Sequence, residues 1–170
     1  RASIKDGNVK ASIEAHAPIA VVADIDILCR QPRPNYVAGL GDVMSNATAI
    51  LDWRLADTEG MDEIDDNIAD IAESCADEVI DHASRFKYIM PDSIDFTIKL
   101  IIRSGKSMQL AKSSRPASGF EHKISHRIDE LLDKQVLHGQ LCGVNSIVSA
   151  MFHERYVNEK EDGRTSDTRC

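Results

Sequence analysis

The sequence lacks the patterns that usually accompany a disulfide framework, a thiolate zinc site or a membrane segment. Its cysteines are scattered and form no C-x-x-C pair; they are Cys29, Cys75, Cys142 and Cys170. No apolar run approaches the roughly 20 residues that a membrane-spanning helix needs, and no basic segment followed by an apolar one opens the chain. These absences disfavour a secreted, disulfide-stapled domain and predict a cytoplasmic protein with reduced thiols and no membrane partner.

Positive charge is also scarce. The chain has 20 lysines and arginines against 28 aspartates and glutamates, so its net charge is −8. This balance argues against nucleic acid and against anionic membrane surfaces as partners. The sequence contains no G-x-G-x-x-G turn, no P-loop and no G-x-S-x-G elbow. It therefore offers no recognisable nucleotide-binding turn and no support for a serine hydrolase.

What is present is a hydrophobic pattern whose period changes along the chain. Residues 2–15 alternate around Asp6-Gly7-Asn8 and predict a β-hairpin. The apolar run from Ile19 to Ala23 predicts a strand that is buried on both faces. After a proline-rich connector at 29–36, the period becomes about 3.6 residues. The expected helices are 42–57, 61–86, 91–114, 120–133 and 138–155.

The predicted fold class is therefore predominantly α, with a helical domain preceded by a short β-hairpin and strand remnant of an α/β domain. We expect the α/β remnant at residues 1–36 and the helical domain at 37–152. Apolar periodicity ends after His153, and charged residues dominate the remainder. Residues 153–170 are accordingly expected to form a charged, disordered tail.

Asp42, His122 and His138 are candidates for binding a divalent metal. One carboxylate and two imidazoles form a sensible ligand set for catalytic zinc, because they leave one position open for water or substrate. Taken singly, each residue has a simpler explanation. Asp42 opens a predicted helix and would serve as its N-cap, and an isolated His138 would more often be a surface or core histidine. The residues alone leave this choice open.

His122 and His126 are four positions apart in "SGFEHKISH", so they share one helix face and could line one cavity. The order E-H-K-I-S-H is not the H-E-x-x-H motif of zinc proteases, and one buried and one solvated histidine would explain the spacing equally well. The serine-rich segment 112–119 could hold an anion at a helix N-terminus or could merely cap the helix. Gly139 and Gly143 predict a close approach between two helices.

Four stretches together resemble the sn-glycerol-1-phosphate dehydrogenases, archaeal ether-lipid enzymes related to glycerol dehydrogenase and dehydroquinate synthase. They are "APIAVVADIDIL", "AGLGDVMSNATAILDWRLA", "SSRPASGFEHKISH" and "LHGQLCGV". The resemblance implies a zinc-dependent and NAD- or NADP-dependent interconversion of sn-glycerol 1-phosphate and dihydroxyacetone phosphate. It implies that Asp42, His122 and His138 bind the zinc ion. It further implies that His126 contacts the substrate or relays its proton, and that Asp42 also contacts the substrate.

The resemblance also implies a dinucleotide-binding half, of which residues 1–36 would be only the last part. The chain opens with Arg1, and we expect it to be a partial chain in which the residues that bind the nicotinamide cofactor cannot be named. A small phosphate compound is the expected partner, and homo-oligomerisation is left open. Two alternatives remain: a related metal-dependent glycerol dehydrogenase and a truncated, non-catalytic fragment.

Overall fold

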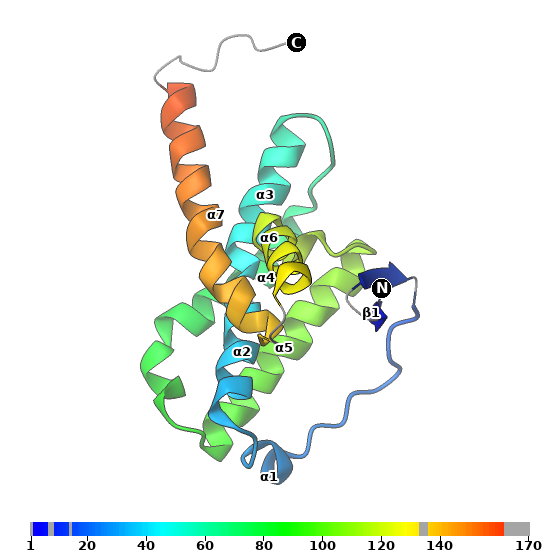
Figure 1. Ribbon diagram of the computed structural model, residues 1–170, viewed down its shortest axis with the longest axis vertical. Coiled ribbons are helices and arrows are strands. Elements are labelled where there is room, and N and C mark those ends of the chain that lie inside the picture. Colours follow the sequence, from blue (N-terminus) through cyan, green and yellow to red (C-terminus); the bar gives the residue numbers. More distant parts are fainter. Residues whose placement is uncertain (1, 7–8, 14, 133–135, 162–170) are drawn as a thin grey trace.

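A computed structural model describes residues 2–6, 9–13, 15–132 and 136–161, and helices dominate it (Figure 1). This confirms the predominantly helical class. The elements, in chain order, are β1 (Ala2–Asp6), β2 (Val9–Ile13), α1 (Ile25–Leu28), α2 (Arg33–Met44), α3 (Asn46–Thr58), α4 (Asp66–Asp81), the 3-10 helix η1 (Ala83–Lys87), α5 (Pro91–Ala111), the 3-10 helix η2 (Arg115–Ala117), α6 (Phe120–Leu131) and α7 (His138–Glu161). No helix in the described ranges is both long and apolar enough to cross a membrane.

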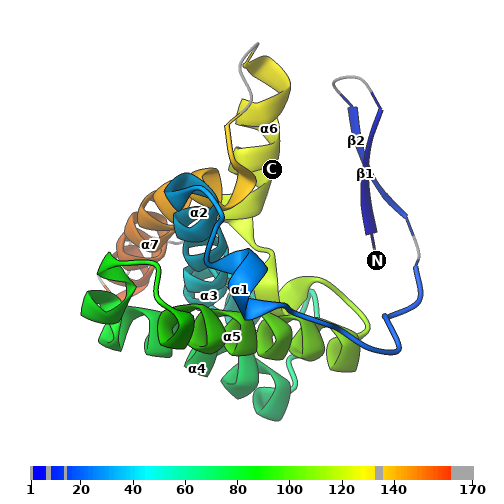
Figure 2. The same cartoon turned by 90° about the horizontal axis from the view of Figure 1, so that it is seen from below.

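The N-terminal region contains the predicted pair of antiparallel strands, but among the described residues it forms no larger remnant of an α/β sheet. Strands β1 and β2 pair antiparallel, with Ala2 opposite Ile13, and Figure 2 shows this ribbon standing apart from the helices. The predicted turn residues 7–8 lie outside the described residues. The strand expected at 19–23 is wrong, because this segment has no regular structure and Ile19 and Val22 are fully exposed. A buried strand needs strand neighbours, and the described part of the chain supplies none beside it.

Helix α2 begins earlier than predicted, inside the segment interpreted as a proline-rich connector. Pro32 is its N-cap and Pro34 lies in its first turn, where a missing backbone N–H costs nothing. Because α2 starts at Arg33, Asp42 lies in its last turn. The N-cap explanation for Asp42 is therefore wrong.

The helices enclose two apolar clusters that share α4. The first joins α2, α4, η1 and α5, and its buried members are Tyr36, Leu40, Val43, Cys75, Val79, Phe86, Ile94 and Leu100. The second joins α3 to α4 and contains Ile50, Trp53, Ala69 and Ala72. Alanines on the inner face of α4 are fully buried, which lets neighbouring helices approach it closely. Asp65 caps α4 by accepting hydrogen bonds from the backbone N–H groups of Asn67 and Ile68.

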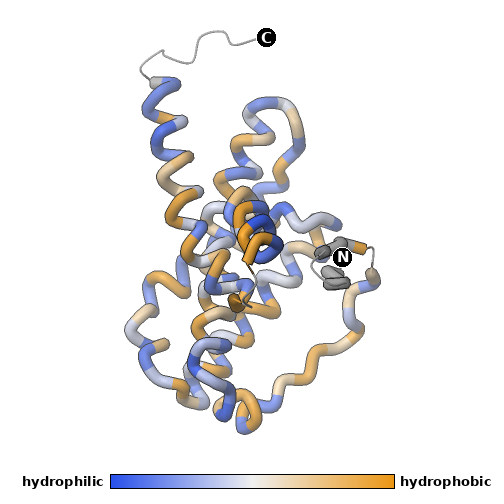
Figure 3. Tube along the Cα trace, viewed as in Figure 1, coloured by the Kyte–Doolittle hydropathy of each residue, from blue (hydrophilic) through white to orange (hydrophobic). Residues whose placement is uncertain are grey.

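Helix α7 extends through part of the predicted disordered tail. It continues to Glu161, and its last turns are strongly hydrophilic (Figure 3). His153 is nevertheless buried, with its Nε2 2.7 Å from Oδ1 of Asp52 in α3. Further along, the Tyr156 hydroxyl donates to Glu59 at 2.7 Å. These polar contacts with α3 replace the missing apolar periodicity, so the prediction of disorder is wrong for 153–161. Residues 162–170 lie outside the described residues.

Glycines bring α2 and α7 together, as the spacing of Gly139 and Gly143 predicted. A Cβ atom on Gly139 would overlap the carbonyl oxygen of Ala38, and one on Gly41 would overlap the carbonyl oxygen of Gly139. Only glycine permits this backbone approach, since any larger residue would force the helices apart. The crossing places the last turn of α2 beside the first turn of α7.

Candidate metal centre

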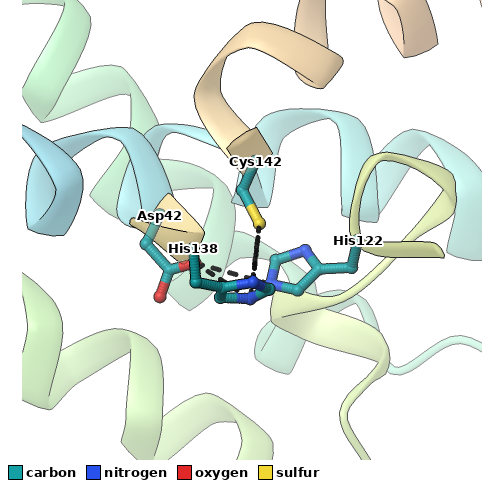
Figure 4. Close-up of side chains that lie close together, drawn as sticks. All are labelled: Asp42, His122, His138 and Cys142. Carbon is teal, nitrogen blue, oxygen red and sulfur yellow. Dashed lines mark hydrogen bonds and ion pairs between the residues drawn. The ribbon is translucent and has the colours of Figure 1, made fainter. Parts of the chain in front are cut away.

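Four potential ligands converge where α2, α6 and α7 meet. Asp42 comes from the last turn of α2, His122 from the first turn of α6, and His138 and Cys142 from the start of α7 (Figure 4). One nitrogen, oxygen or sulfur atom from each lies within 4.8 Å of the other three. The fold thus brings together the three residues named as ligands from the resemblance, although 80 and then 16 positions separate them in the sequence (122 − 42 and 138 − 122).

Three of the separations between these atoms are close to those around a tetrahedral ion. Asp42 Oδ1 lies 3.5 Å from His122 Nε2 and 3.9 Å from His138 Nε2. The Sγ atom of Cys142 lies 3.4 Å from His138 Nε2. Ligands bound at about 2.1 Å in a tetrahedron are roughly 3.4 Å apart. Carboxylate, imidazole and thiolate donors at these distances fit a zinc ion, and only small shifts would be needed to bind it.

A buried carboxylate fixes the orientation of His122. The Nδ1 atom of His122 lies 2.8 Å from Oε1 of Glu121, which is completely buried. The backbone N–H of Gly119 donates to the same oxygen at 2.8 Å, and the Thr48 hydroxyl donates to Oε2 at 3.2 Å. Because Nδ1 faces Glu121, Nε2 faces the cluster. Many metal sites hold a ligating imidazole in this way through a carboxylate on its second nitrogen.

The electrostatics of the cluster favour positive charge at its centre. Burial alone would lower the pKa of His122, but hydrogen bonds with Asp42, Cys142 and Glu121 outweigh it and raise that pKa to about 11. For Asp42, burial opposes ionisation, yet the hydrogen bond and charge of His122 hold its pKa below the ordinary value. Asp42 also lies at the negative end of the α2 dipole, where a carboxylate is unfavourable without a nearby cation.

His126 lies beside the cluster and outside the four-residue ligand group. Its ring centroid is 6.4 Å from that of His122 and 5.3 Å from that of His138, and the centroids of His122 and His138 are 5.0 Å apart. The three imidazoles therefore lie close together. His126 is placed where it could meet a molecule that approaches the metal ligands.

The N-terminus of α6 is occupied by the protein's own carboxylates. The backbone N–H of Gly119 donates to Glu121, and that of Phe120 donates to Asp52. An anion from solution would have to displace these groups, so segment 112–119 gains no support as an anion site. Asp52 also pairs with His153 and thereby links α3, α6 and α7.

Sequence reasoning missed Cys142, because cysteines were considered only as C-x-x-C pairs. The available signal was its spacing, since a residue four positions after His138 lies on the same helix face. In the structure its side chain is completely buried.

Comparisons with known proteins point to one group of enzymes. No family model matches the chain. It is 42% identical over 153 residues to the glycerol-1-phosphate dehydrogenase (NAD(P)+) of Methanococcoides burtonii. The matched region covers 90% of this chain and 43% of the relative. The Pyrococcus horikoshii protein of the same name is 43% identical over 152 residues, with 89% and 44% covered. The chain spans less than half the length of these relatives. Over nine tenths of its own length it is similar to glycerol-1-phosphate dehydrogenases, which confirms the resemblance that the four motifs indicated.

Proposed function

We propose that this chain is the metal-binding part of a cytoplasmic, zinc-dependent glycerol-1-phosphate dehydrogenase that interconverts sn-glycerol 1-phosphate and dihydroxyacetone phosphate with NAD or NADP for ether phospholipid synthesis. The observation that carries the proposal is the convergence of Asp42, His122 and His138 from three helices, with Asp42 Oδ1 at 3.5 Å and 3.9 Å from the two imidazole nitrogens and all ligand atoms within 4.8 Å of one another. The oxidised substrate and the nucleotide come from the names of the relatives, which share about two fifths of their residues with this chain over the matched region. The product and the role in ether phospholipid synthesis are what the resemblance implies.

Each residue of the cluster has a distinct role in this proposal. Asp42, His122 and His138 hold the zinc ion. Glu121 accepts the Nδ1 proton of His122 and so keeps the Nε2 lone pair directed at the metal. A bound zinc ion would act as a Lewis acid that lowers the pKa of the substrate's C2 hydroxyl, so that hydride transfer to nicotinamide proceeds near neutral pH.

His126 is the proposed proton carrier. An imidazole titrates close to neutral pH, so it can accept the proton of the C2 hydroxyl during oxidation and return it during reduction. Its ring lies 5.3 Å from that of His138, centroid to centroid, which places it next to the ligands without making it one. The half-exposed carboxylate of Asp42 is the second group proposed to contact the substrate.

Zinc titration of the full chain tests the proposed site. We expect the parent chain to bind about one zinc ion. We expect His122→Ala to bind none. The control is His16→Ala, because His16 is exposed and lies far from α6 in the sequence. Equal uptake by the parent chain and His122→Ala would contradict the proposal.

Turnover measurements test the reaction. Because the resemblance implies a separate dinucleotide-binding half, the assay uses a zinc-loaded full-length version that includes this half. It is supplied with NAD+ or NADP+ and with sn-glycerol 1-phosphate or glycerol, and we expect turnover of the phosphorylated substrate only. His126→Ala should lower the rate by roughly 10²- to 10⁴-fold while zinc uptake stays unchanged. Faster turnover of glycerol would identify a polyol dehydrogenase. No turnover of either substrate by the full-length version would contradict the proposed reaction, and turnover by the full-length version but not by this chain alone would identify the chain as a non-catalytic fragment.

A further inference from the structure

Cys142 places a sulfur atom beside the three proposed zinc ligands. Its Sγ atom lies 3.4 Å from Nε2 of His138, and one ligand atom each of Asp42 and His122 lies within 4.8 Å of it. Because His138 and Cys142 are four positions apart on α7, they project from one helix face one turn apart. Figure 4 shows the sulfur pointing toward the imidazoles and the carboxylate. The thiol thus faces all three ligands.

Core packing does not explain this position. Cys75 is equally buried, but it belongs to the apolar cluster between α2, α4 and α5. Cys142 belongs to neither apolar cluster of the described residues, and its sulfur faces polar atoms. A buried cysteine that serves only as a small hydrophobic residue is expected among apolar side chains. The Cys75 sulfur, within its apolar cluster, accepts a hydrogen bond from Arg103 at 3.2 Å. The two cysteines have the same burial, but within the described residues only Cys142 lies among potential metal ligands.

We infer that Cys142 is a fourth protein ligand of the metal and binds it through its thiolate sulfur. The inference rests on the proposed zinc site, and it is carried by the four ligand atoms that lie within 4.8 Å of one another. Zinc–sulfur bonds are about 2.3 Å long, slightly longer than zinc–nitrogen bonds. The 3.4 Å gap between Sγ and His138 Nε2 is close to the edge of such a tetrahedron.

A fourth ligand changes how substrate reaches the metal. With three protein ligands, the ion keeps an open position for the substrate oxygen. With Cys142 bound, all four tetrahedral positions are filled, so the substrate oxygen must displace the thiolate or enter as a fifth donor. Sulfur also makes the site selective, because thiolates favour zinc and cobalt over magnesium and manganese.

Cobalt(II) is the probe that reports on sulfur ligation. It takes the place of zinc in tetrahedral sites and is coloured, and a thiolate ligand adds an intense near-ultraviolet charge-transfer band that nitrogen and oxygen ligands do not give. We expect this band when the parent chain is titrated with cobalt(II), together with the visible bands of a tetrahedral ion. Cys142→Ser should lose the near-ultraviolet band, keep visible bands and bind the metal roughly 10- to 100-fold more weakly. Cys75→Ser is the matched control and should retain the parent spectrum.

The outcomes separate this inference from the proposed function. Cobalt binding by the parent chain without the near-ultraviolet band would overturn ligation by Cys142 and leave the other three ligands in place. The same band in Cys142→Ser would overturn it as well. No cobalt binding by the parent chain would overturn the metal site itself. The near-ultraviolet band is measured on the parent chain itself. Its presence or absence therefore tests ligation by Cys142 even if circular dichroism shows that Cys142→Ser folds poorly.

Discussion

Glu121 is a buried residue that orients the imidazole ring of its neighbour His122. Its carboxylate is completely buried and receives hydrogen bonds from Gly119 and Thr48, with the His122 ring at 2.8 Å. A buried charge is tolerated only when it is paired in this way, because desolvation otherwise costs several kcal/mol. The negative charge of Glu121 also makes the His122 imidazole more electron-rich and hence a better metal ligand.

Replacing Glu121 with glutamine tests this dependence. Glu121→Gln keeps the size and much of the hydrogen bonding but removes the charge, so we expect zinc affinity to fall by roughly 10- to 100-fold. Competition with a chromophoric chelator measures the change. Glu130→Gln is the control, since Glu130 lies on the same helix but pairs with Arg127 at the surface. Parent-like affinity in Glu121→Gln would show that the charge does not support the ligand.

Zinc affinity should rise with pH because the metal must displace a proton from His122. In the metal-free chain the pKa of His122 is raised from 6.5 to about 11, so the folded protein keeps this proton well above neutrality. The proton lost from His122 alone raises affinity about tenfold for each pH unit, and binding of the Cys142 thiolate would release a further proton and make the slope steeper. Chelator competition across the neutral and mildly alkaline range measures this slope. An affinity that is constant above neutral pH would contradict it. The same shift stabilises the metal-free fold fully below pH 6.5, and this contribution is lost as the pH rises toward 11.

At the residue level, the sequence predicted the candidate metal ligands, but only the fold determines which side chains surround them. The motifs singled out Asp42, His122 and His138, which the fold brings together. Their chemistry could not be predicted locally, because the neighbours that shift the pKa of His122 come from α2 and α7 as well as α6. Cys142 was overlooked because a single cysteine indicates a metal site only when the fold shows which other ligands lie near it in space.

At the scale of elements, the crossing of α2 and α7 positions the candidate site. Gly41, Gly139 and Gly143 allow the two backbones to touch, and this contact brings Asp42 to His138. The helices are already in backbone contact, and a Cβ atom added at Gly41 or Gly139 would overlap backbone atoms of the facing helix. The geometry of the ligands therefore depends on glycines that bind nothing themselves.

Adding one methyl group at the crossing should weaken both the fold and the site. In Gly139→Ala the new Cβ would overlap the carbonyl oxygen of Ala38, and we expect a loss of about 1–3 kcal/mol of unfolding free energy together with weaker zinc binding. Urea denaturation measures the first effect. Gly105→Ala on α5 is the control, because nothing lies within 4 Å of its Cβ position. That variant should gain up to about 1 kcal/mol from helix propensity. Equal effects of the two substitutions would rule out the steric explanation.

Helices were predictable where a local pattern determines them, and errors arose where tertiary contacts decide. The apolar spacing on α4 and α5 predicted both helices, since one face of each is buried. The start of α2 was missed because prolines usually mark connectors, although they are equally suited to a first turn. The last turns of α7 were assigned to a tail because polar contacts with Asp52 and Glu59 hold them, and such contacts leave no hydrophobic periodicity.

At the scale of the whole molecule, the proposed ligands connect elements from distant parts of the chain. A metal held by α2, α6 and α7 would bind the folded protein and not the unfolded one, so it should stabilise the entire helical body. At a free zinc concentration one hundred times the Kd, the gain is about 2.7 kcal/mol. Each kcal/mol raises the Tm of a domain this size by about 2–4 °C.

Thermal unfolding monitored by circular dichroism tests this linkage. We expect zinc to raise the Tm, a chelator to reverse the increase and magnesium to have no effect. In His122→Ala the zinc-dependent increase should disappear. A Tm that does not depend on zinc in the parent chain would show that metal binding and folding are not coupled.

The order of the ligands along the chain determines when the site can first exist. Asp42 precedes His138 by 96 residues (138 − 42), which a ribosome takes roughly 5–20 s to add at about 5–20 residues per second. During that interval the emerging protein contains one ligand, then two, and no complete coordination sphere. Only after α7 has been synthesised and has docked on α2 are all four side chains in place. Zinc would therefore be acquired by a nearly folded body and could not direct the early steps of its folding.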